Sequence, residues 1–480
     1  MQLRKTLTLA CGLLASTAVL AARSDWRQMT VGHFHLYSTM RDSKTRDVAR
    51  QLQAFEKTVG EILRTNDAMP DVPTVIYILD YGDFQHYCAD GSGRIGVFYE
   101  EPYVNVITIN GDLDFGTLKS TVFHEYTHFI QRNSSTSKMP PWFKEGYAEL
   151  FSSFELKGDK VTLGEVPAGE TIYRERWIPM ERLLAVKQSD PEYRAERLAP
   201  QFYAESWALV HLLLFDDESL TRPTDYYLTN LNIGVSEPDA FAQAFPFDKK
   251  GLDERLQKLI KDRLIRVKTI TYAEGVSVDN APISAMTAIQ ADAQMARMAL
   301  QIGLQKKIAA PLAAAALKEN LSDPAVRALS ARIAANGGGR EDIEDLARAL
   351  EKGGTNDPQL RIDIAATLLS LSQSKVSGNR AFAILDDLVH TDSAPLEAIG
   401  LWAEAAQMTQ VDWAKMVPVL ESGTARAPHN FDLLRQLAAV HERLGESDKA
   451  RDCYDRIILV SDKPEERLWA QKQEDSGRRR

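Results

Sequence analysis

Cysteine and histidine are both scarce in this sequence, and neither sign of charge dominates it. The 480 residues include 3 Cys and 9 His, with 57 Lys and Arg against 67 Asp and Glu, a formal net charge of -10. After the N-terminal segment only Cys88 and Cys453 remain, one in each half of the chain, so we expect free thiols and exclude a disulfide scaffold. A phosphate-binding surface needs clustered excess Lys and Arg, so this acidic balance argues against nucleic acid as a partner.

Long hydrophobic runs are also absent, except near the N-terminus. There Arg4 and Lys5 precede a short apolar stretch ending in the small residues Ala21 and Ala22, which is the pattern of a secretory signal peptide. We therefore predict a signal peptide over residues 1–22 and export, to a bacterial periplasm or alternatively by secretion. An uncleaved anchor is disfavoured because the run is shorter than the roughly 20 residues of a spanning helix. No later segment could span a bilayer, so no integral membrane segment is expected after cleavage.

The length and the hydrophobic periodicity predict more than one domain. A chain of this size exceeds one ordinary core, and its first half mixes two periodicities. Strand patterns occur at residues 34–39, 73–79 and 103–109, and helical patterns at 48–63 and 116–133. We predict an α+β domain over residues 23–275.

Glycines at 91, 93 and 96 form a formal GxGxxG, the pattern of a dinucleotide-binding turn. That motif requires a helix opening on its last glycine, whereas the residues that follow have strand character. We interpret these glycines as a surface turn.

From about residue 280 the sequence becomes rich in Ala and Leu with helical spacing. Prolines recur at 324, 358, 395, 428 and 464, in steps of 34, 37, 33 and 36 residues. This is the period of tetratricopeptide repeats, and residues 433–454 resemble that repeat in their small, large and turn positions. We predict an all-α, TPR-like solenoid over residues 285–470, a possible site for a protein partner, and a disordered tail over 471–480.

The strongest chemical signal is the pentapeptide His124-Glu125-Tyr126-Thr127-His128. Residues four apart share one helix face, so both imidazoles can bind one ion, while Glu125 can reach a water on it. Apolar neighbours on this helix place the pair in a protected cleft. The alternative is a pair of core histidines satisfied by ordinary hydrogen bonds.

A second helical segment begins at Met139, with Pro140 and Pro141 suited to its opening turn. Its Glu145 lies 17 residues after His128, within the apolar and aromatic sequence WFKEGYAELF. Glutamates four apart most often lie on a solvated face, and that is the alternative for Glu145 and Glu149. The apolar surroundings argue against it.

HExxH followed by a helix with W-F-x-E-G-x-A-E resembles the gluzincin zinc metallopeptidases, especially peptidase-MA-like domains of the thermolysin and aminopeptidase N superfamily. The resemblance implies a zincin-like fold, a Zn²⁺ cofactor, and His124, His128 and Glu145 as its ligands. It implies that Glu149 supports a ligand histidine and that Glu125 is the general base. The expected reaction is hydrolysis of peptide bonds in a protein or peptide substrate.

Members of this family also use a Tyr or His donor beyond the third ligand. The segment 201–214 resembles their Y-x-x-S-x-x-L-V helix, so Tyr203 is the candidate catalytic donor, with simple packing of its ring as the alternative. His211 on the same helix is expected to be a satisfied core residue. By the same resemblance, 103–109 is expected to be an edge strand that pairs with substrate. No G-x-M-E-N segment precedes the HExxH, which puts strict aminopeptidase activity in doubt.

Two classes of function follow from these patterns. The leading one is a zinc peptidase whose repeats recognise protein. The other is a non-catalytic interaction module built on a peptidase-like scaffold plus repeats. Since inactive relatives usually lose a ligand or the base, the presence of His124, Glu125, His128 and Glu145 together favours the enzyme.

Overall fold

The structure is a computed structural model, and its chain divides into two compact units. One comprises Met1–Thr45, Asp71–Asp112 and Ala281–Arg480, and the other Arg46–Pro70 and Leu113–Asn280. We call them the sheet–helix unit and the site unit. The structure describes residues 26–63, 72–88, 96–113, 115–134, 139–166, 172, 177–195, 197–263, 265–272, 280–304, 308–335, 340–353, 356–372, 374–409, 411–461 and 463–477.

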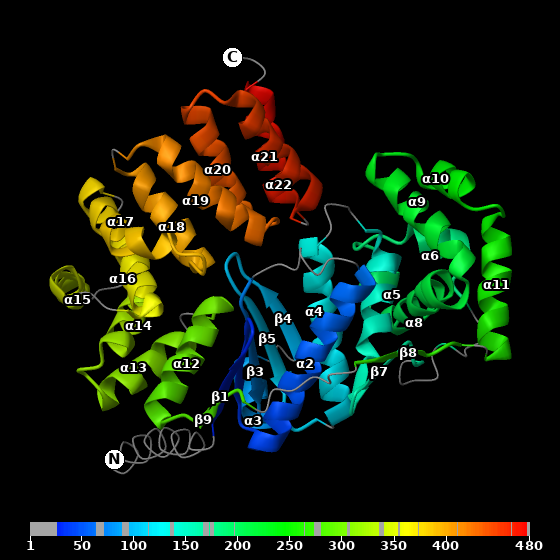
Figure 1. Cartoon of the computed structure of the whole chain (residues 1–480), viewed down its shortest axis with the longest axis horizontal. Helices are drawn as coiled ribbons and strands as arrows, with labels where there is room; N and C mark the ends of the chain where they lie inside the picture. Colours follow the sequence, from blue (N-terminus) through cyan, green and yellow to red (C-terminus); the bar gives the residue numbers. More distant parts are fainter. Residues whose placement is uncertain are drawn as a thin grey trace, which may run out of the picture. The chain divides into compact units, whose positions relative to one another are not determined.

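The sheet–helix unit contains a six-stranded mixed sheet in the order β4-β5-β3-β2-β1-β9 (Figure 1). Strands β2, β3 and β5 pair in parallel, and the remaining pairs are antiparallel. The strands are β1 (Arg27–Val31), β2 (Phe34–Ser38), β3 (Thr74–Leu79), β4 (Gly96–Glu100), β5 (Asn105–Asn110) and β9 (Ile283–Ala285). The three predicted strands are confirmed within one or two residues.

Strand β5, which contains most of the predicted edge strand 103–109, is an internal strand. It pairs with β3 on one side and with β4 on the other. The prediction that this segment is free to pair with substrate is wrong, because β4 already satisfies its outer hydrogen-bonding edge. All six residues of β5 are buried.

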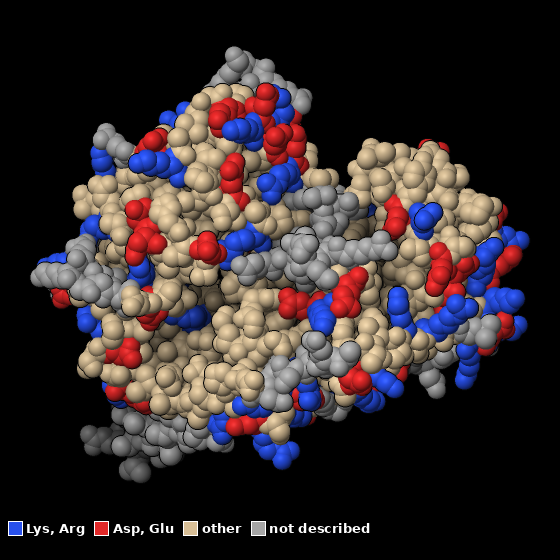
Figure 2. Space-filling view, viewed as in Figure 1, with Lys and Arg blue, Asp and Glu red and all other residues tan. Residues whose placement is uncertain are grey.

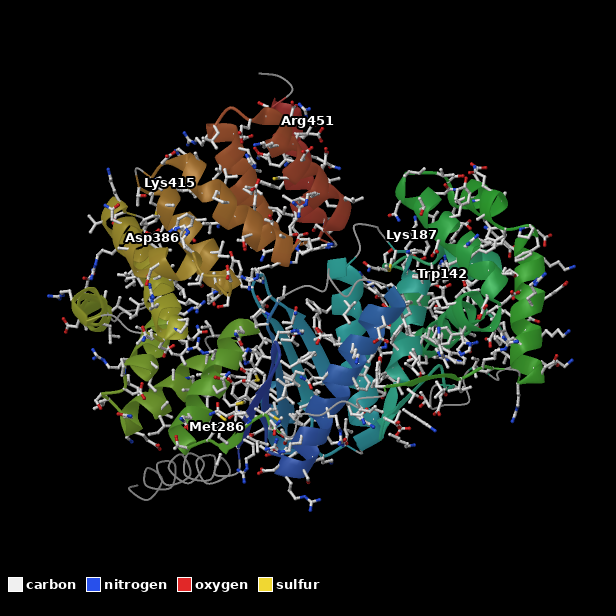
Figure 3. All side chains as sticks on the ribbon, viewed as in Figure 1. Trp142, Lys187, Met286, Asp386, Lys415 and Arg451 are labelled. Carbon is white, nitrogen blue, oxygen red and sulfur yellow. The ribbon has the colours of Figure 1, made fainter. Side chains whose placement is uncertain are left out.

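One face of the sheet packs on helices from the C-terminal half of the chain. Val75, Tyr77 and Leu79 alternate along β3 and share a buried cluster with Met295 and Ala299. Their helix, α12 (Ala288–Gln301), begins at a capping box of Thr287 and Gln290. Met286, which joins β9 to this helix, lies at the base of the same cluster (Figure 3). The sheet therefore gains its core from sequence beyond residue 280, across the predicted boundary between residues 275 and 285.

The C-terminal helices are stacked in pairs. Consecutive helices pack on each other, and the first helices of successive pairs, α12, α14, α16, α18 and α20, also contact their neighbours. The helices are α13 (Ala310–Glu319), α14 (Pro324–Ala334), α15 (Arg340–Gly353), α16 (Pro358–Leu371), α17 (Lys375–Val389), α18 (Leu396–Gln407), α19 (Trp413–Arg426), α20 (Phe431–Arg443), α21 (Ser447–Val460) and α22 (Pro464–Gly477). An α+β part followed by an all-helical part is thus confirmed, while the TPR assignment stays a prediction.

The recurring prolines mark where each pair begins. Pro324, Pro358 and Pro464 are the first residues of α14, α16 and α22, and Pro395 is the N-cap of α18. Proline suits this position because the first helical N–H has no intrahelical partner. Pro428 precedes α20, whose N-cap is Asn430.

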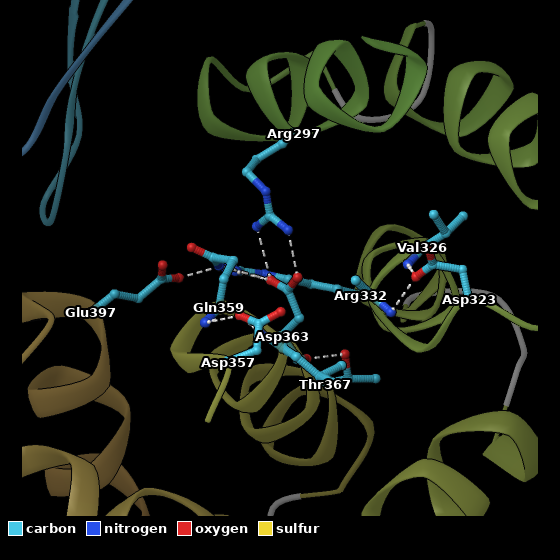
Figure 4. A network of polar contacts seen from close by, with 11 residues as sticks. Arg297, Asp323, Val326, Arg332, Asp357, Gln359, Asp363, Thr367 and Glu397 are labelled. Atoms are coloured by element: carbon cyan, nitrogen blue, oxygen red, sulfur yellow. Dashed lines mark hydrogen bonds and ion pairs between the residues drawn. The ribbon is translucent and has the colours of Figure 1, made fainter. Parts of the chain in front are cut away.

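A buried ion network joins four helices of the stack, α12, α14, α16 and α18 (Figure 4). Asp363 of α16 is 1% exposed and accepts hydrogen bonds from Arg297 at 3.1 and 2.7 Å and from Arg332 at 2.9 Å. Arg332 also pairs with Glu397. Burial opposes the charge of Asp363, but the two guanidinium groups hold the pKa of its carboxyl below the usual range. Each charge in the network has a partner of opposite sign.

The turn between β4 and β5 contacts the helical stack. The ring of Tyr103 lies where a side chain at Gly400 of α18 would be, since a Cβ there would be 2.5 Å from the Tyr103 Cζ. The amide of Asn430, just before α20, donates to the carbonyl of Pro102. Residue 400 must therefore be glycine for this contact, and the same surface of α18 is already covered by the chain itself.

The site unit contains nearly all of α2 (Asp42–Leu63) and the elements between residues 113 and 272. They are α4 (Phe115–Ser134), α5 (Pro141–Ser152), β6 (Glu155–Lys157), β7 (Lys160–Leu163), α6 (Met180–Ala185), α7 (Pro191–Arg194), α8 (Ala199–His211), a π-helical turn (Leu212–Asp216), a 3-10 turn (Glu218–Leu220), α9 (Thr221–Asn232), α10 (Glu237–Ala244), α11 (Lys249–Asp262) and β8 (Lys268–Thr271). Strands β6, β7 and β8 form a small antiparallel sheet.

Three predictions concern the chain ends and one turn. The signal peptide over residues 1–22 lies outside the described residues, as do Gly91 and Gly93. The prediction of a disordered tail over 471–480 is wrong for residues 471–477, because α22 continues through Gly477.

Among the described residues, no helix is long and apolar enough to cross a membrane. On the face seen in Figure 2, positive and negative side chains are interspersed.

Candidate metal centre

Helix α4 presents His124 and His128 on one face, one turn apart. Its opposite side is held in an aromatic core, where the ring of Phe123 stacks on Phe55 of α2 at 4.5 Å and Phe154 lies edge-on to both. Tyr126 is fully buried in the same core. Packing thus fixes the rotation of α4 and turns both imidazoles away from this core.

Helix α5 supplies the third group, Glu145, whose residue is only 3% exposed. The helix begins at Pro141 and packs on both α4 and α8. Residue 146, which follows Glu145, must be glycine, because a Cβ there would lie 2.2 Å from the backbone oxygen of Ser206 in α8. In the E-G pair of the motif, Glu145 therefore supplies a polar group to the site, and Gly146 allows the backbones of α5 and α8 to approach closely.

His124, His128 and Glu145 converge on a common centre. Nε2 of His128 lies 3.2 Å from Nε2 of His124 and 3.2 Å from Oε2 of Glu145, and His124 Nε2 lies 3.6 Å from the same oxygen. In a tetrahedral zinc site, ligand atoms about 2.1 Å from the ion lie about 3.4 Å apart. The three atoms therefore already have the spacing of three corners of such a site. Within the described residues, theirs is the one group of three or more such side chains that could hold a metal ion.

The other ring nitrogens face acceptors on the side away from this centre. Nδ1 of His124 lies 3.4 Å from Oε1 of Glu149, and Nδ1 of His128 lies 3.4 Å from Oε1 of Gln131. An acceptor at Nδ1 favours the tautomer with its proton there, which leaves the lone pair of Nε2 for an ion. The structure thus brings Glu149 to its predicted position. Gln131 was not predicted, although its spacing of three residues from His128 on one helix was a usable signal.

A further residue in contact with the centre, Tyr193, was also not predicted. Its hydroxyl donates to Oε1 of Glu145 at 2.6 Å. It lies on α7, a single turn 48 residues beyond Glu145, where no periodicity or motif gives a signal.

The electrostatics of the centre favour a positive charge. Burial alone would raise the pKa of the Glu145 carboxyl, but the two histidines beside it hold that pKa well below its usual range. Burial would likewise lower the pKa of His124, yet its hydrogen bond to Glu145 and the charges of Glu149 and Glu125 raise it to about 9. An excess of carboxylates over cations surrounds the three converging atoms, which suits a bound cation.

Glu125 and Tyr203 lie within electrostatic range of this centre. The negative charge of Glu125 contributes to the raised pKa of His124 and of Tyr203. Within the described part of the chain, the carboxylate of Glu125 makes no hydrogen bond. Tyr203 of α8 is half-buried, and its ring lies edge-on to Tyr193 at 6.2 Å. Burial and the nearby glutamates raise the pKa of Tyr203, so it remains a neutral hydrogen-bond donor.

The residues predicted to be structural or free thiols are buried and do not belong to the group that could hold a metal ion. His211 is fully buried, with Nδ1 2.5 Å from Asp216 and Nε2 3.0 Å from the carbonyl of Gly164, which confirms it as a satisfied core residue. Cys88 and Cys453 are free and buried, as predicted. Burial raises the pKa of their thiols to about 12 and about 11, so neither is a reactive thiolate at neutral pH.

Comparison with known proteins finds one partial match. A family described as a protein of unknown function (DUF1570) matches residues 119–223, a segment that runs from α4 to the start of α9. It includes both histidines, Glu125, Glu145, Glu149, Tyr193 and Tyr203. No curated protein and no solved structure matches the chain.

Proposed function

We propose that this protein is a zinc-dependent peptidase of gluzincin type, with a zincin-like site built from α4, α5 and α8. The observation that carries the proposal is the convergence of His124 Nε2, His128 Nε2 and Glu145 Oε2 at tetrahedral spacing. Two imidazoles and one carboxylate form the ligand set of catalytic zinc sites, which keep one position open. We propose that the protein is exported, so zinc and substrate are met outside the cytoplasm.

The chain's own residues have distinct functions in this mechanism. Zinc, when bound, supplies Lewis acidity at the open position. Glu125, free of hydrogen bonds within the described residues, takes a proton from the attacking water and delivers it to the leaving amine. Tyr203, neutral at working pH, donates its hydroxyl proton in a hydrogen bond to the oxyanion that develops on the scissile carbonyl. Peptide bonds in a protein or peptide are the substrate we propose.

The helical stack is proposed to recognise protein, but through a restricted surface. The face of α18 at Gly400 already contacts Tyr103 of the same unit. A partner therefore has to bind the stack elsewhere or compete with this turn.

The test compares metal content and peptide cleavage in the protein lacking residues 1–22. We expect about one zinc per chain by mass spectrometry and cleavage within a peptide library. Glu125→Gln should keep the zinc and lose roughly 10²–10⁴-fold in rate, since general-base catalysis is worth that much. His128→Ala should lose the metal as well. Glu254→Gln, whose side chain is 69% exposed on α11, is the matched control and should change neither.

Three results would contradict parts of the proposal. A wild-type protein without zinc would exclude the metal site, and cleavage that survives Glu125→Gln would exclude the mechanism. Zinc binding without peptide cleavage would favour a hydrolase of other substrates or the non-catalytic interaction module.

A further inference from the structure

We infer that Tyr193 is a positioning residue that holds Glu145 as a one-oxygen ligand of the metal. The inference rests on the proposed zinc site. It assigns a function to a residue outside the HExxH and E-G-x-A motifs, on a different element.

The two oxygens of Glu145 have different partners. Oε2 faces Nε2 of both His124 and His128, at 3.6 and 3.2 Å, while Oε1 accepts the Tyr193 hydroxyl at 2.6 Å. A strong donor on one carboxylate oxygen makes that oxygen the poorer ligand, so a cation is favoured on the other. The coordination position that a second carboxylate oxygen would take is thereby kept for water and substrate.

Hydrogen bonds to Asp190 and Glu192 hold the turn that carries Tyr193. Arg182 of α6 donates to both oxygens of Glu192 at 2.8 and 2.6 Å and to Asp190 at 2.9 Å. Asp190 also accepts the backbone N–H of Lys187 at 3.1 Å. A four-residue helix has little stability of its own, so these contacts contribute to its order.

The ring of Tyr193 is held against α8. It lies edge-on to Phe202 at 5.9 Å and to Tyr203 at 6.2 Å. The same helix meets α5 at the close contact between Ser206 and Gly146. Tyr193 and the helix that carries Glu145 therefore both pack on α8. This shared packing fixes the position of the hydroxyl relative to the carboxylate.

The experiment replaces zinc by cobalt(II) and compares wild type with Tyr193→Phe. The visible d–d absorption of cobalt(II) weakens and shifts when a four-coordinate site becomes five-coordinate. We expect Tyr193→Phe to show that change, because the freed Oε1 can also bind the ion. We also expect roughly 10–100-fold weaker zinc binding, the usual cost of losing a residue that supports a ligand.

The matched control is Tyr147→Phe. Tyr147 lies on α5, two residues from Glu145, and its buried hydroxyl has no hydrogen-bond partner among the described residues. The control should therefore keep the wild-type spectrum and affinity. Circular dichroism checks that each variant is folded, and Arg182→Met, which leaves Tyr193 in place but loosens its turn, should give a smaller change of the same kind.

The outcomes separate the two hypotheses. If wild type binds neither zinc nor cobalt(II), the proposed function fails and this inference with it. If wild type binds both and Tyr193→Phe keeps its spectrum and affinity, only the inference is overturned. An equal change in Tyr147→Phe would also overturn it, since the effect would then be one of packing.

Discussion

Two of the buried polar clusters in the described residues, one in each compact unit, pair their charges differently. In the helical stack, Arg297, Arg332, Asp363 and Glu397 pair donors with acceptors of opposite charge. In the site unit, His124, His128 and Glu145 turn three electron-pair donors toward one point, with further carboxylates around them. The charges of the first cluster are paired with one another, whereas the second is a group that could hold a metal ion.

This difference separates a structural polar network from a candidate site. Both clusters are buried, both contain ion pairs, and both shift pKa values, so none of these properties alone identifies function. What distinguishes them is whether the hydrogen-bonding groups satisfy one another. Substitutions, added zinc and changes of pH test this difference.

Removal of Asp363 should have the largest effect on stability. Asp363→Ala leaves two guanidinium groups without their shared carboxylate in the stack, and breaking a buried pair costs about 3–5 kcal/mol. Urea denaturation measures the loss in the free energy of unfolding. The control is Asp448→Ala, which removes an exposed i,i+3 pair with Arg451 and should cost under about 1 kcal/mol. Equal losses in both variants would mean that the network is not the paired structural unit we describe.

Zinc should stabilise the folded protein through the cluster of His124, His128 and Glu145, and not through the network around Asp363. Free zinc at 100 times its dissociation constant should add about 2.7 kcal/mol to the free energy of unfolding. The gain should persist in Asp363→Ala and disappear in His128→Ala, as followed by denaturation with and without buffered zinc. A gain of the same size in His128→Ala would place the ion elsewhere.

Gly146→Ala should separate α5 from α8. The new Cβ would lie 2.2 Å from the Ser206 oxygen, and such overpacking costs about 1–3 kcal/mol. Because Glu145 is adjacent, zinc binding should weaken as well. Gly251→Ala in α11, where the nearest side-chain atoms would lie 3.3 Å away, needs only a small shift of those side chains and should cost less than Gly146→Ala. Wild-type zinc affinity in Gly146→Ala would show that the site tolerates movement of α5.

The last effect is confined to one interval of pH. Burial raises the pKa of Glu205 from 4.5 to about 7 in the folded protein. Folded chains therefore keep this proton to higher pH than unfolded ones, so the stability contribution of Glu205 falls as pH rises from about 4.5 to 7 and is constant above. Glu205→Gln cannot titrate, and its stability relative to wild type should rise by up to about 3 kcal/mol across that interval. Parallel pH profiles of the two proteins would contradict the assignment.

The sequence predicted the local elements of the site better than their assembly. His124, Glu125 and His128 follow from helical spacing, and Glu145 from its motif and its apolar neighbours. Tyr193 could not be predicted, because one turn of helix carries no periodic signal and its partner Glu145 lies 48 residues away.

The sheet shows the same limit. Strands β2, β3 and β5 were predicted from their β-branched content, but strand order is a non-local property. The pairing of β4 with the outer side of β5, and of the three-residue β9 with β1, depends on contacts that no short window contains. The prediction of an edge strand failed for this reason.

The contact of Tyr103 with Gly400 has a consequence for how this chain can evolve. Arrays of helical repeats ordinarily tolerate gain or loss of whole repeats, because each contacts only its neighbours. Here the first helix, α12, packs on the sheet, and α18 packs on the turn between β4 and β5 of the same sheet. An insertion or deletion of a helix pair between them would shift one anchor relative to the other. Because Asn430, the N-cap of α20, also contacts this turn, the segment from α12 to the start of α20 is of fixed length. Variation in the number of helix pairs is therefore confined to the helices that follow.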